Sequence, residues 1–207
     1  MVWRRSQIRE QAGPSVVAEG IVTTTPIATP DGWRPAGSLV PGSVVLTFDA
    51  GPQQVTSAHV MAMGQAYPSH WPLLVPAWAL DNRDDLVLLP EQKVLIEADV
   101  AEDLYGDPFA LISAQSMEGW RGIVRWRPPE GAAVVVLGFA RPQVIYASRG
   151  VLLSCHGDPF AEGELSEPLH ITYSLGQARH LIACLMAEEA GAALREVGQH
   201  PLGLGQR

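Results

Sequence analysis

Short apolar segments, interrupted by turn-forming residues, constrain the fold of this chain more than any other feature. From Val16 to about residue 157, runs of four to eight residues rich in Val, Ile, Leu and Thr alternate with Pro, Gly, Asp or Asn. Two typical runs are "SVVLTFD" (43–49) and "AAVVVLGFA" (132–140). Runs of this length and composition predict β-strands. The 17 prolines and 20 glycines are spread along the chain and leave little room for helices here. The sequence therefore predicts a mostly β fold.

The last third of the chain has a different period. Apolar residues recur every three or four positions between residues 175 and 197, which predicts an amphipathic helix, and Gly191 could divide it in two. A shorter helix is predicted within "ADVAEDLYG" (98–106), which has acidic residues early and ends in glycine. We expect three parts: a polar lead-in over residues 1–15, a β domain over 16–158, and a loop with a C-terminal helical segment over 159–207.

Charge and hydropathy exclude several classes of protein. The net charge is −8, so the whole chain lacks the basic surface expected of a protein that binds nucleic acid or an anionic membrane. No apolar run reaches 18 residues, and none follows Arg4 and Arg5. We therefore expect neither a transmembrane helix nor a secretory signal. The expected location is the cytoplasm, with export that leaves no N-terminal signal as the open alternative.

The cysteines and histidines do not form a recognisable site. Cys155 and Cys184 are too few for a disulfide scaffold, and neither belongs to a CxxC pair. Two reduced thiols are expected, although a single bridge between them stays open. The six histidines lack the spacing of a zinc site, so we expect no metal and no cofactor. The acidic loop "DNRDD" (81–85) lacks the alternating ligands of a calcium loop and is expected to be solvated.

Three stretches share their order of turns and strands with a known family. The first is "ATPDGWRPAGSLVPGSVVLTFDAGPQQV" (28–55), in which Asp31-Gly32 predicts a hairpin turn and Pro41-Gly42 a second turn. The second is "LLVPAWALDNRDDLVLLPEQKVLIE" (73–97), and the third, a weaker likeness, is "VVVLGFARPQVIYASRGV" (134–151). Together they resemble bacterial Hint domains, the Hedgehog/intein module, over roughly residues 18–157. The resemblance implies a horseshoe of short strands.

The resemblance also implies a chemistry, and this sequence departs from it at each expected position. In Hint domains a Cys or Ser attacks the preceding carbonyl carbon in an acyl shift, a Thr/Ser-x-x-His pair assists, and a further nucleophile accepts the acyl group. The nucleophile position falls on Gly20, the Ser and His of the pair fall on Leu89 and Gln92, and a later His falls on Pro142. None of these side chains is a nucleophile or a general acid or base at neutral pH. The resemblance is thus to a degenerate member.

Two alternative nucleophiles remain. Thr23, Thr24 or Thr25 could replace the lost residue, but a threonine needs an adjacent base, and the expected base is Gln92. The simpler interpretation is that the three threonines begin a strand. Cys155 lies next to His156, which could activate a thiolate, but adjacent residues on a strand point to opposite faces.

Tryptophan and arginine alternate in "GWRGIVRWRPP" (119–129), which contains Trp120, Arg121, Arg125 and Trp126. Such a pattern can bind a partner peptide through cation–π and stacking contacts. An edge strand covered by its own long side chains would give the same pattern. We retain these four residues as candidates for an interaction surface.

The sequence as a whole predicts a catalytically inactive Hint-like domain that acts as a structural or protein-interaction module. The expected partner is another protein or a second copy of the chain, with no nucleic acid and no membrane. The alternative is an enzyme: an autoprocessing protein that cleaves near residues 19–25 through a threonine, or a thiol enzyme that uses Cys155.

Overall fold

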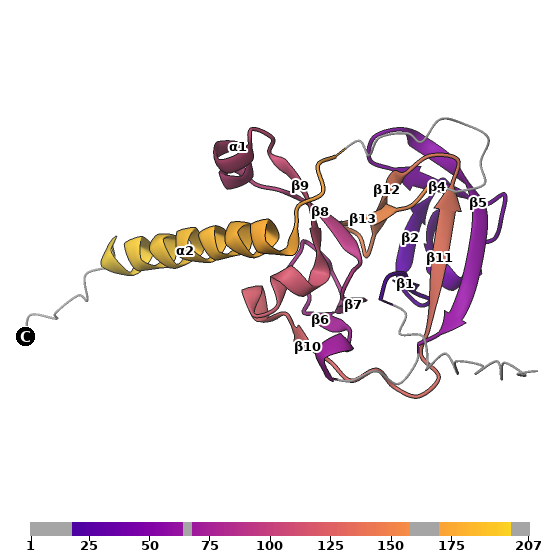
Figure 1. Ribbon diagram of the computed structural model, residues 1–207, viewed down its shortest axis with the longest axis horizontal. Helices are drawn as coiled ribbons and strands as arrows, with labels where there is room; N and C mark the ends of the chain where they lie inside the picture. Colours follow the sequence, from indigo (N-terminus) through magenta and orange to yellow (C-terminus); the bar gives the residue numbers. More distant parts are fainter. Residues whose placement is uncertain (1–17, 64–67, 158–169, 200–207) are drawn as a thin grey trace, which may run out of the picture.

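The computed structural model describes residues 18–63, 68–157 and 170–199, with side chains described as far as residue 195. Thirteen strands form one curled sheet, and a long helix leads away from it (Figure 1). Within the described residues, no helix is long and apolar enough to cross a membrane. The expected mostly β fold with a C-terminal helix is confirmed.

The strands follow one path across the sheet, in the order β10-β6-β7-β1-β11-β5-β4-β12-β13-β8-β9, and β2 pairs with both β12 and β3. All the pairs between strands are antiparallel. The bounds are β1 Ile21–Val22, β2 Pro26–Thr29, β3 Gly32–Pro35, β4 Val44–Thr47, β5 Gly51–Ala62, β6 Leu73–Val75, β7 Leu86–Leu88, β8 Lys93–Glu97, β9 Phe109–Ser113, β10 Val124–Arg125, β11 Ala133–Phe139, β12 Gln143–Ala147 and β13 Val151–Cys155.

Helices are few, as the distribution of proline and glycine predicts. The α-helices are α1, Asp99–Tyr105, and α2, Leu175–Gln199. The 3-10 turns are η1 Ala36–Ser38, η2 Pro68–His70, η3 Ala114–Met117 and η4 Trp120–Gly122. Gly106 ends α1 with φ 82°, a left-handed conformation that suits glycine, and its N–H donates to the Glu102 carbonyl. The short helix predicted over residues 98–106 is therefore confirmed.

The two turns predicted by the first motif are also present. β2 and β3 form a hairpin closed at Thr29 and Gly32, and Gly32 has φ 107°. The Thr29 hydroxyl donates to the Gly32 carbonyl at 2.6 Å. Gly42 lies in the second turn with φ 93°, a value that side-chain-bearing residues rarely adopt. Dipeptides of this kind predict turns because glycine tolerates positive φ at no steric cost.

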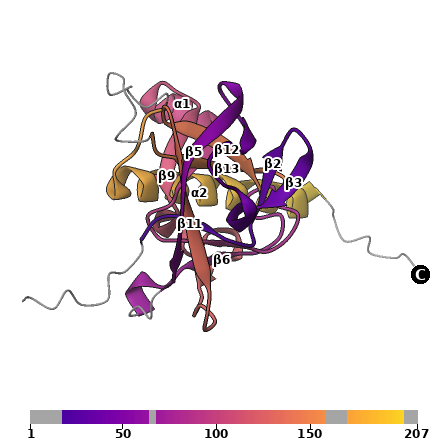
Figure 2. The ribbon, with the colours of Figure 1, turned by 90° about the vertical axis from the view of Figure 1, so that its right-hand side faces the viewer.

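The core extends from the sheet to the first half of α2. Strand residues such as Ile27, Val135 and Leu153 belong to the same buried cluster as Leu181 and Ile182 of α2. Helix α2 continues through Gly191 without a break, and its second half projects away from the sheet (Figure 1). Figure 2 shows the helix behind the strands. The apolar stripe is thus buried on its own body only over the first turns. The predicted divisions at residues 15 and 158 fall in or beside segments outside the described residues and stay predictions.

Candidate functional site

The segment where the acyl shift would occur is tightly held by its neighbours. The Ala18 carbonyl accepts a hydrogen bond from the Glu91 N–H at 2.9 Å, and β1 begins three residues later, at Ile21. β1 lies between β11 and β7, with Ile21 opposite both Val135 and Leu88. The chain therefore enters the domain along a fixed path, next to the residues that replace the expected catalytic pair.

Gly20, at the nucleophile position, has a backbone that disfavours a side chain. Its φ is 138°, outside the range that side-chain-bearing residues usually adopt. A Cβ atom at this position would lie 3.4 Å from the Val135 carbonyl oxygen and 3.4 Å from the Val136 Cγ2. A cysteine or serine would fit only with a change in backbone conformation.

Gln92 is a structural cross-link between two strands. It is 2% exposed, and its side-chain nitrogen donates to the Ser154 carbonyl of β13 at 2.9 Å and to the Lys93 carbonyl at 3.1 Å. Leu89 is also buried, and its carbonyl accepts a hydrogen bond from the Gln92 N–H. Both side chains at the Ser-x-x-His positions therefore stabilise the fold and offer no proton-transfer group.

The chain leaves the β domain beside the point where it enters. Directly after β13, the ring nitrogen Nε2 of His156 lies 3.0 Å from a carboxylate oxygen of Glu19. The hydrogen bond with Glu19 raises the pKa of His156 above its usual value, and partial burial of the ring opposes the effect. Pro142 lies against the same exit, because a Cβ on Gly157 would come 3.0 Å from the Pro142 Cδ.

Residues 154–157 therefore contact Gln92 and Pro142, and they lie beside Gly20 through its neighbour Glu19. Ser154 accepts from Gln92, His156 pairs with Glu19 next to Gly20, and Gly157 packs on Pro142. The structure thus brings the sequence-predicted positions together even though their side chains cannot perform an acyl shift.

Cys155 and His156 lie on opposite faces at the end of β13. Cys155 is 6% exposed, whereas the His156 side chain is 68% exposed and faces away, as alternation along a strand predicts. Burial and the nearby negative charge of Glu19 raise the pKa of the Cys155 thiol to about 12. Cys184 lies on α2, half-buried and 4.0 Å from the His180 ring, and both cysteines are free thiols.

Thr23, Thr24 and Thr25 lie in a turn between β1 and β2, and the expectation that they begin a strand is wrong. The Thr25 N–H donates to the Val22 carbonyl at 2.9 Å, and the Thr23 carbonyl accepts from the Gly37 N–H at 2.8 Å. The sequence does not predict this turn, because three consecutive β-branched residues favour a strand. The Gln92 side-chain amide donates to the Lys93 and Ser154 carbonyls and not to the threonine hydroxyls.

The tryptophan–arginine segment contacts helix α2. Trp120 is buried, and its indole nitrogen donates to the Glu189 carboxylate at 3.2 Å. The Arg121 guanidinium lies over the Trp120 ring, 4.4 Å from its centroid, and forms an ion pair with the same carboxylate at 2.8 Å. A second bond joins Arg121 to the Ala79 carbonyl. These two residues therefore attach α2 to the body.

Arg125 and Trp126 lie at or beside the edge strand β10. Arg125 forms an ion pair with Glu118 at 3.0 Å and donates to the Trp71 carbonyl. The half-buried Trp126 donates its backbone N–H to the Pro72 carbonyl. The expectation of an edge strand agrees with this geometry, while a contact of the four residues with another chain stays a prediction.

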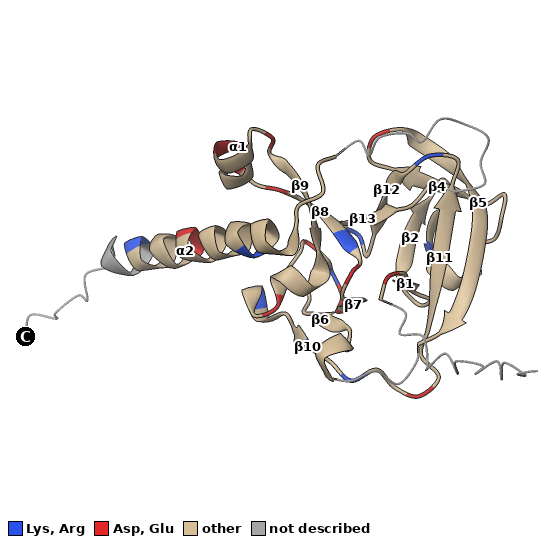
Figure 3. Cartoon of the chain, in the orientation of Figure 1, with Lys and Arg blue, Asp and Glu red and all other residues tan. Residues whose placement is uncertain are grey.

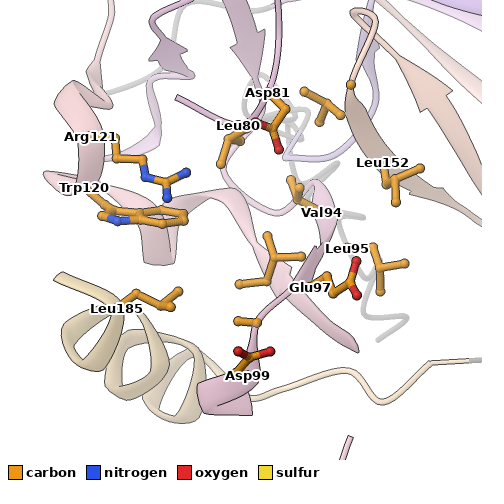
Figure 4. Close-up of a pocket in the computed structure, with 14 residues that line it drawn as sticks. Leu80, Asp81, Val94, Leu95, Glu97, Asp99, Trp120, Arg121, Leu152 and Leu185 are labelled. Atoms are coloured by element: carbon orange, nitrogen blue, oxygen red, sulfur yellow. The ribbon is translucent and has the colours of Figure 1, made fainter. Parts of the chain in front are cut away.

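A cavity of about 610 Å³ lies between the sheet and the middle of α2 (Figure 4). Trp120, Arg121 and Leu185 line one side, and Leu95 and Leu152 line the other. Its acidic lining residues are Asp81, Glu97 and Asp99. The volume is in the range of ligand-binding sites. Sequence reasoning missed this cavity, because its walls come from segments far apart in the chain.

The cavity is bordered by unusual backbone. Asp81 has φ 59° and Arg121 has φ 47°, and both line the cavity. Gly150 is pressed so closely on Asp81 that a Cβ would lie 2.3 Å from the Asp81 carbonyl oxygen. Elsewhere, acidic and basic residues are interspersed over the described elements (Figure 3).

Comparison with known proteins identifies the family. A family model described as the Hint domain matches residues 20–155. Among solved structures, the chain is similar to the MchDnaB-1 intein (18% identity, TM-score 0.43, 67% of this chain and 99% of that one). It is also similar to a bacterial intein-like domain from Clostridium thermocellum (12% identity, TM-score 0.48, 65% and 97%). A third is the AceL NrdHF class 3 split intein (12% identity, TM-score 0.47, 68% and 99%).

No curated protein matches the chain. The family match covers well over half of the 207 residues and agrees with the position of the motifs read from the sequence. The chain therefore belongs to the Hint domain family.

Proposed function

We propose that this Hint domain is catalytically inactive and serves as a structural or protein-interaction module. The observation that carries the proposal is the environment of the replaced residues. Gly20 has φ 138°, and Gln92 uses its amide to bridge two strands. Residues in these roles stabilise the fold, so a return to the family chemistry would require changes in the backbone as well as in the side chains.

The threonine alternative receives little support. The backbone of Thr23 is bonded to Ala133 and Gly37, and that of Thr25 to Val22 and Ala36. Among the described residues, no side-chain hydrogen bond joins these threonines to Gln92, Glu19 or His156. A threonine hydroxyl is a weak nucleophile unless a base removes its proton. The residue expected to act as that base is a glutamine already bonded to two carbonyls.

The thiol alternative is opposed by electrostatics. A thiol with a pKa of about 12 is almost entirely protonated at neutral pH, and the thiolate is the reactive form. The nearby Glu19 carboxylate adds to this effect, because it repels a second negative charge. Cys155 therefore fits a buried structural residue of β13 better than a nucleophile.

We propose a protein partner or a second copy of the chain as the binding partner. The second half of α2 extends beyond the sheet, and the helix exposes Met186 near its middle and Leu194 towards its end, at 45% and 74%. Arg125, in the edge strand β10, and Trp126, directly after it, offer a second candidate surface. The cytoplasm remains the expected compartment.

Intact-mass spectrometry of the expressed chain, fresh and after incubation with hydroxylamine and dithiothreitol, tests the loss of chemistry. A single species at the full mass of 22.3 kDa is expected. A fragment cut between Glu19 and Thr25 would overturn the proposal. Replacement of all three threonines with valine, compared with Cys155→Ala, would then identify which alternative is correct.

A further inference from the structure

The cavity beside α2 carries an uncompensated negative charge. Within the described part of the chain, Asp81, Glu97 and Asp99 have no ion-pair or hydrogen-bond partner for their carboxylates. The cavity's basic lining residue is Arg121, and its charge is neutralised by Glu189 at 2.8 Å. The opening therefore attracts cationic groups.

The walls of the same cavity are apolar. Leu80 and Leu95 are buried, and Leu152 and Leu185 are half-buried. A ligand that combines positive charge with aromatic or aliphatic side chains would complement both properties, because it would neutralise the carboxylates and remove apolar surface from water. A polypeptide segment that contains arginine beside tryptophan or isoleucine has this composition.

The chain itself contains such a segment. The first nine residues, "MVWRRSQIR", include Trp3, Arg4, Arg5, Ile8 and Arg9. The segment contains three basic residues and no acidic one, and it lies outside the described residues.

The segment is also long enough to reach the cavity. Ala18 is hydrogen-bonded to Glu91, two residues before β8, and the far end of β8 carries Glu97. Six residues of extended chain span about 20 Å. The residues before Ala18 could span roughly 55 Å if fully extended.

We propose that the arginine-rich segment 1–9 docks on this cavity, with its arginines on Glu97, Asp99 and Asp81 and its apolar side chains on the leucine walls. The proposal concerns a contact within the chain and does not depend on whether the acyl-shift chemistry is lost. A partner protein that carries a similar basic sequence would compete with the segment for the cavity.

Limited trypsin digestion of the full-length chain tests the proposal, with the rate of cleavage after Arg5 as the readout. Docking protects this bond. In the variant Glu97→Gln/Asp99→Asn, cleavage is expected to accelerate about five-fold, the factor that two weak ion pairs supply. The control Asp31→Asn/Asp103→Asn removes the same amount of charge from the β2–β3 hairpin and from α1, at two residues that do not line the cavity. It should leave the rate of cleavage unchanged.

A second pair of variants separates docking from a general charge effect. Arg4→Gln/Arg9→Gln keeps the bond after Arg5 but removes two of the docking charges, so cleavage should accelerate by a similar factor. In the chain that carries both sets of substitutions, the two effects should not multiply. The proposal would be overturned if the two effects multiplied, or if the wild type and the cavity variant were cleaved at equal rates. Protection that falls on dilution would also overturn it, in favour of docking between two copies of the chain.

Discussion

At the scale of single residues, the positions where the Hint resemblance predicts catalytic side chains have structural roles in this chain. Gln92 illustrates the change, because the side chain that replaces a histidine joins β8 to β13 through the Ser154 carbonyl. Sequence comparison predicts the loss of chemistry at this position, since glutamine cannot transfer protons at neutral pH. It does not predict the new role, which depends on a partner 62 residues away in the chain.

Gly20→Cys restores the expected nucleophile and tests whether one residue is all that is missing. We expect no cleavage and a loss of about 1–3 kcal/mol in the free energy of unfolding, because a side chain at φ 138° is strained. Urea unfolding and intact mass give the two readouts. The matched control is Gly176→Cys, at a glycine in α2 with open space around its Cβ position. Cleavage in Gly20→Cys, or equal stability of the two variants, would contradict the prediction.

The Glu19–His156 pair predicts a dependence of stability on pH. The pKa of His156 is higher in the folded chain than in the unfolded chain, so the folded state binds the proton more tightly. The stabilisation is therefore complete below the unfolded value of about 6.5 and is lost as the pH rises through the higher folded value.

His156→Gln should remove this dependence. Because the side chain is more than half exposed, we expect a difference from the wild type of only about 0.5 kcal/mol near pH 6, and a smaller one near pH 9. Urea unfolding at the two pH values measures it, and Glu19→Gln should give the same pattern. A difference that grows towards pH 9 would contradict the assignment.

At the scale of elements, local patterns predict most of the secondary structure, and the exceptions have specific causes. The hairpin at Asp31-Gly32 and the helix end at Gly106 follow from glycine in left-handed conformations. The turn at Thr23–Thr25 was missed because β-branched residues favour strands, whereas here the bonds to Val22 and Gly37 outweigh that preference. Gly191 leaves α2 intact, since one glycine costs only about 1 kcal/mol in a helix.

The contact of Glu189 with Trp120 and Arg121 should determine how firmly the projecting part of α2 is held. Glu189→Ala removes an ion pair and leaves a buried indole N–H without its partner. We expect a loss of about 1 kcal/mol in stability and faster amide hydrogen exchange in α2 beyond residue 185. Glu188→Ala is the control, because this neighbouring glutamate is exposed and lies outside the contact. Equal exchange in the two variants would show that the contact does not hold the helix.

At the scale of the whole molecule, the sequence predicts the class of fold but not which distant segments of the curled sheet meet. The order of turns and strands identifies the family, because turn residues and β-branched runs act locally. The meeting of the entry segment with the exit at His156 depends on strands far apart in the chain and cannot be read from local patterns. The same limit applies to the cavity beside α2, which no single segment encodes.

The shared core predicts that α2 and the sheet unfold as one unit, although the sequence suggested a separate segment from residue 159. Leu181 of α2 is fully buried in the same cluster as Val135 and Leu153. Leu181→Ala should therefore destabilise the whole chain by about 2–5 kcal/mol. Far-ultraviolet circular dichroism follows the helix, and tryptophan fluorescence follows the β body together with the Trp120 contact to α2. The two signals should keep one common midpoint.

Leu194→Ala is the control for this prediction. Leu194 is 74% exposed on the projecting half of α2, so its substitution should change stability by less than about 0.5 kcal/mol. If the helix melted at a lower denaturant concentration than the tryptophan signal in the wild type, α2 would be an independent appendage. We expect the two transitions to coincide, to shift together in Leu181→Ala and to stay unchanged in Leu194→Ala. This result would show that the first half of α2 unfolds together with the β body.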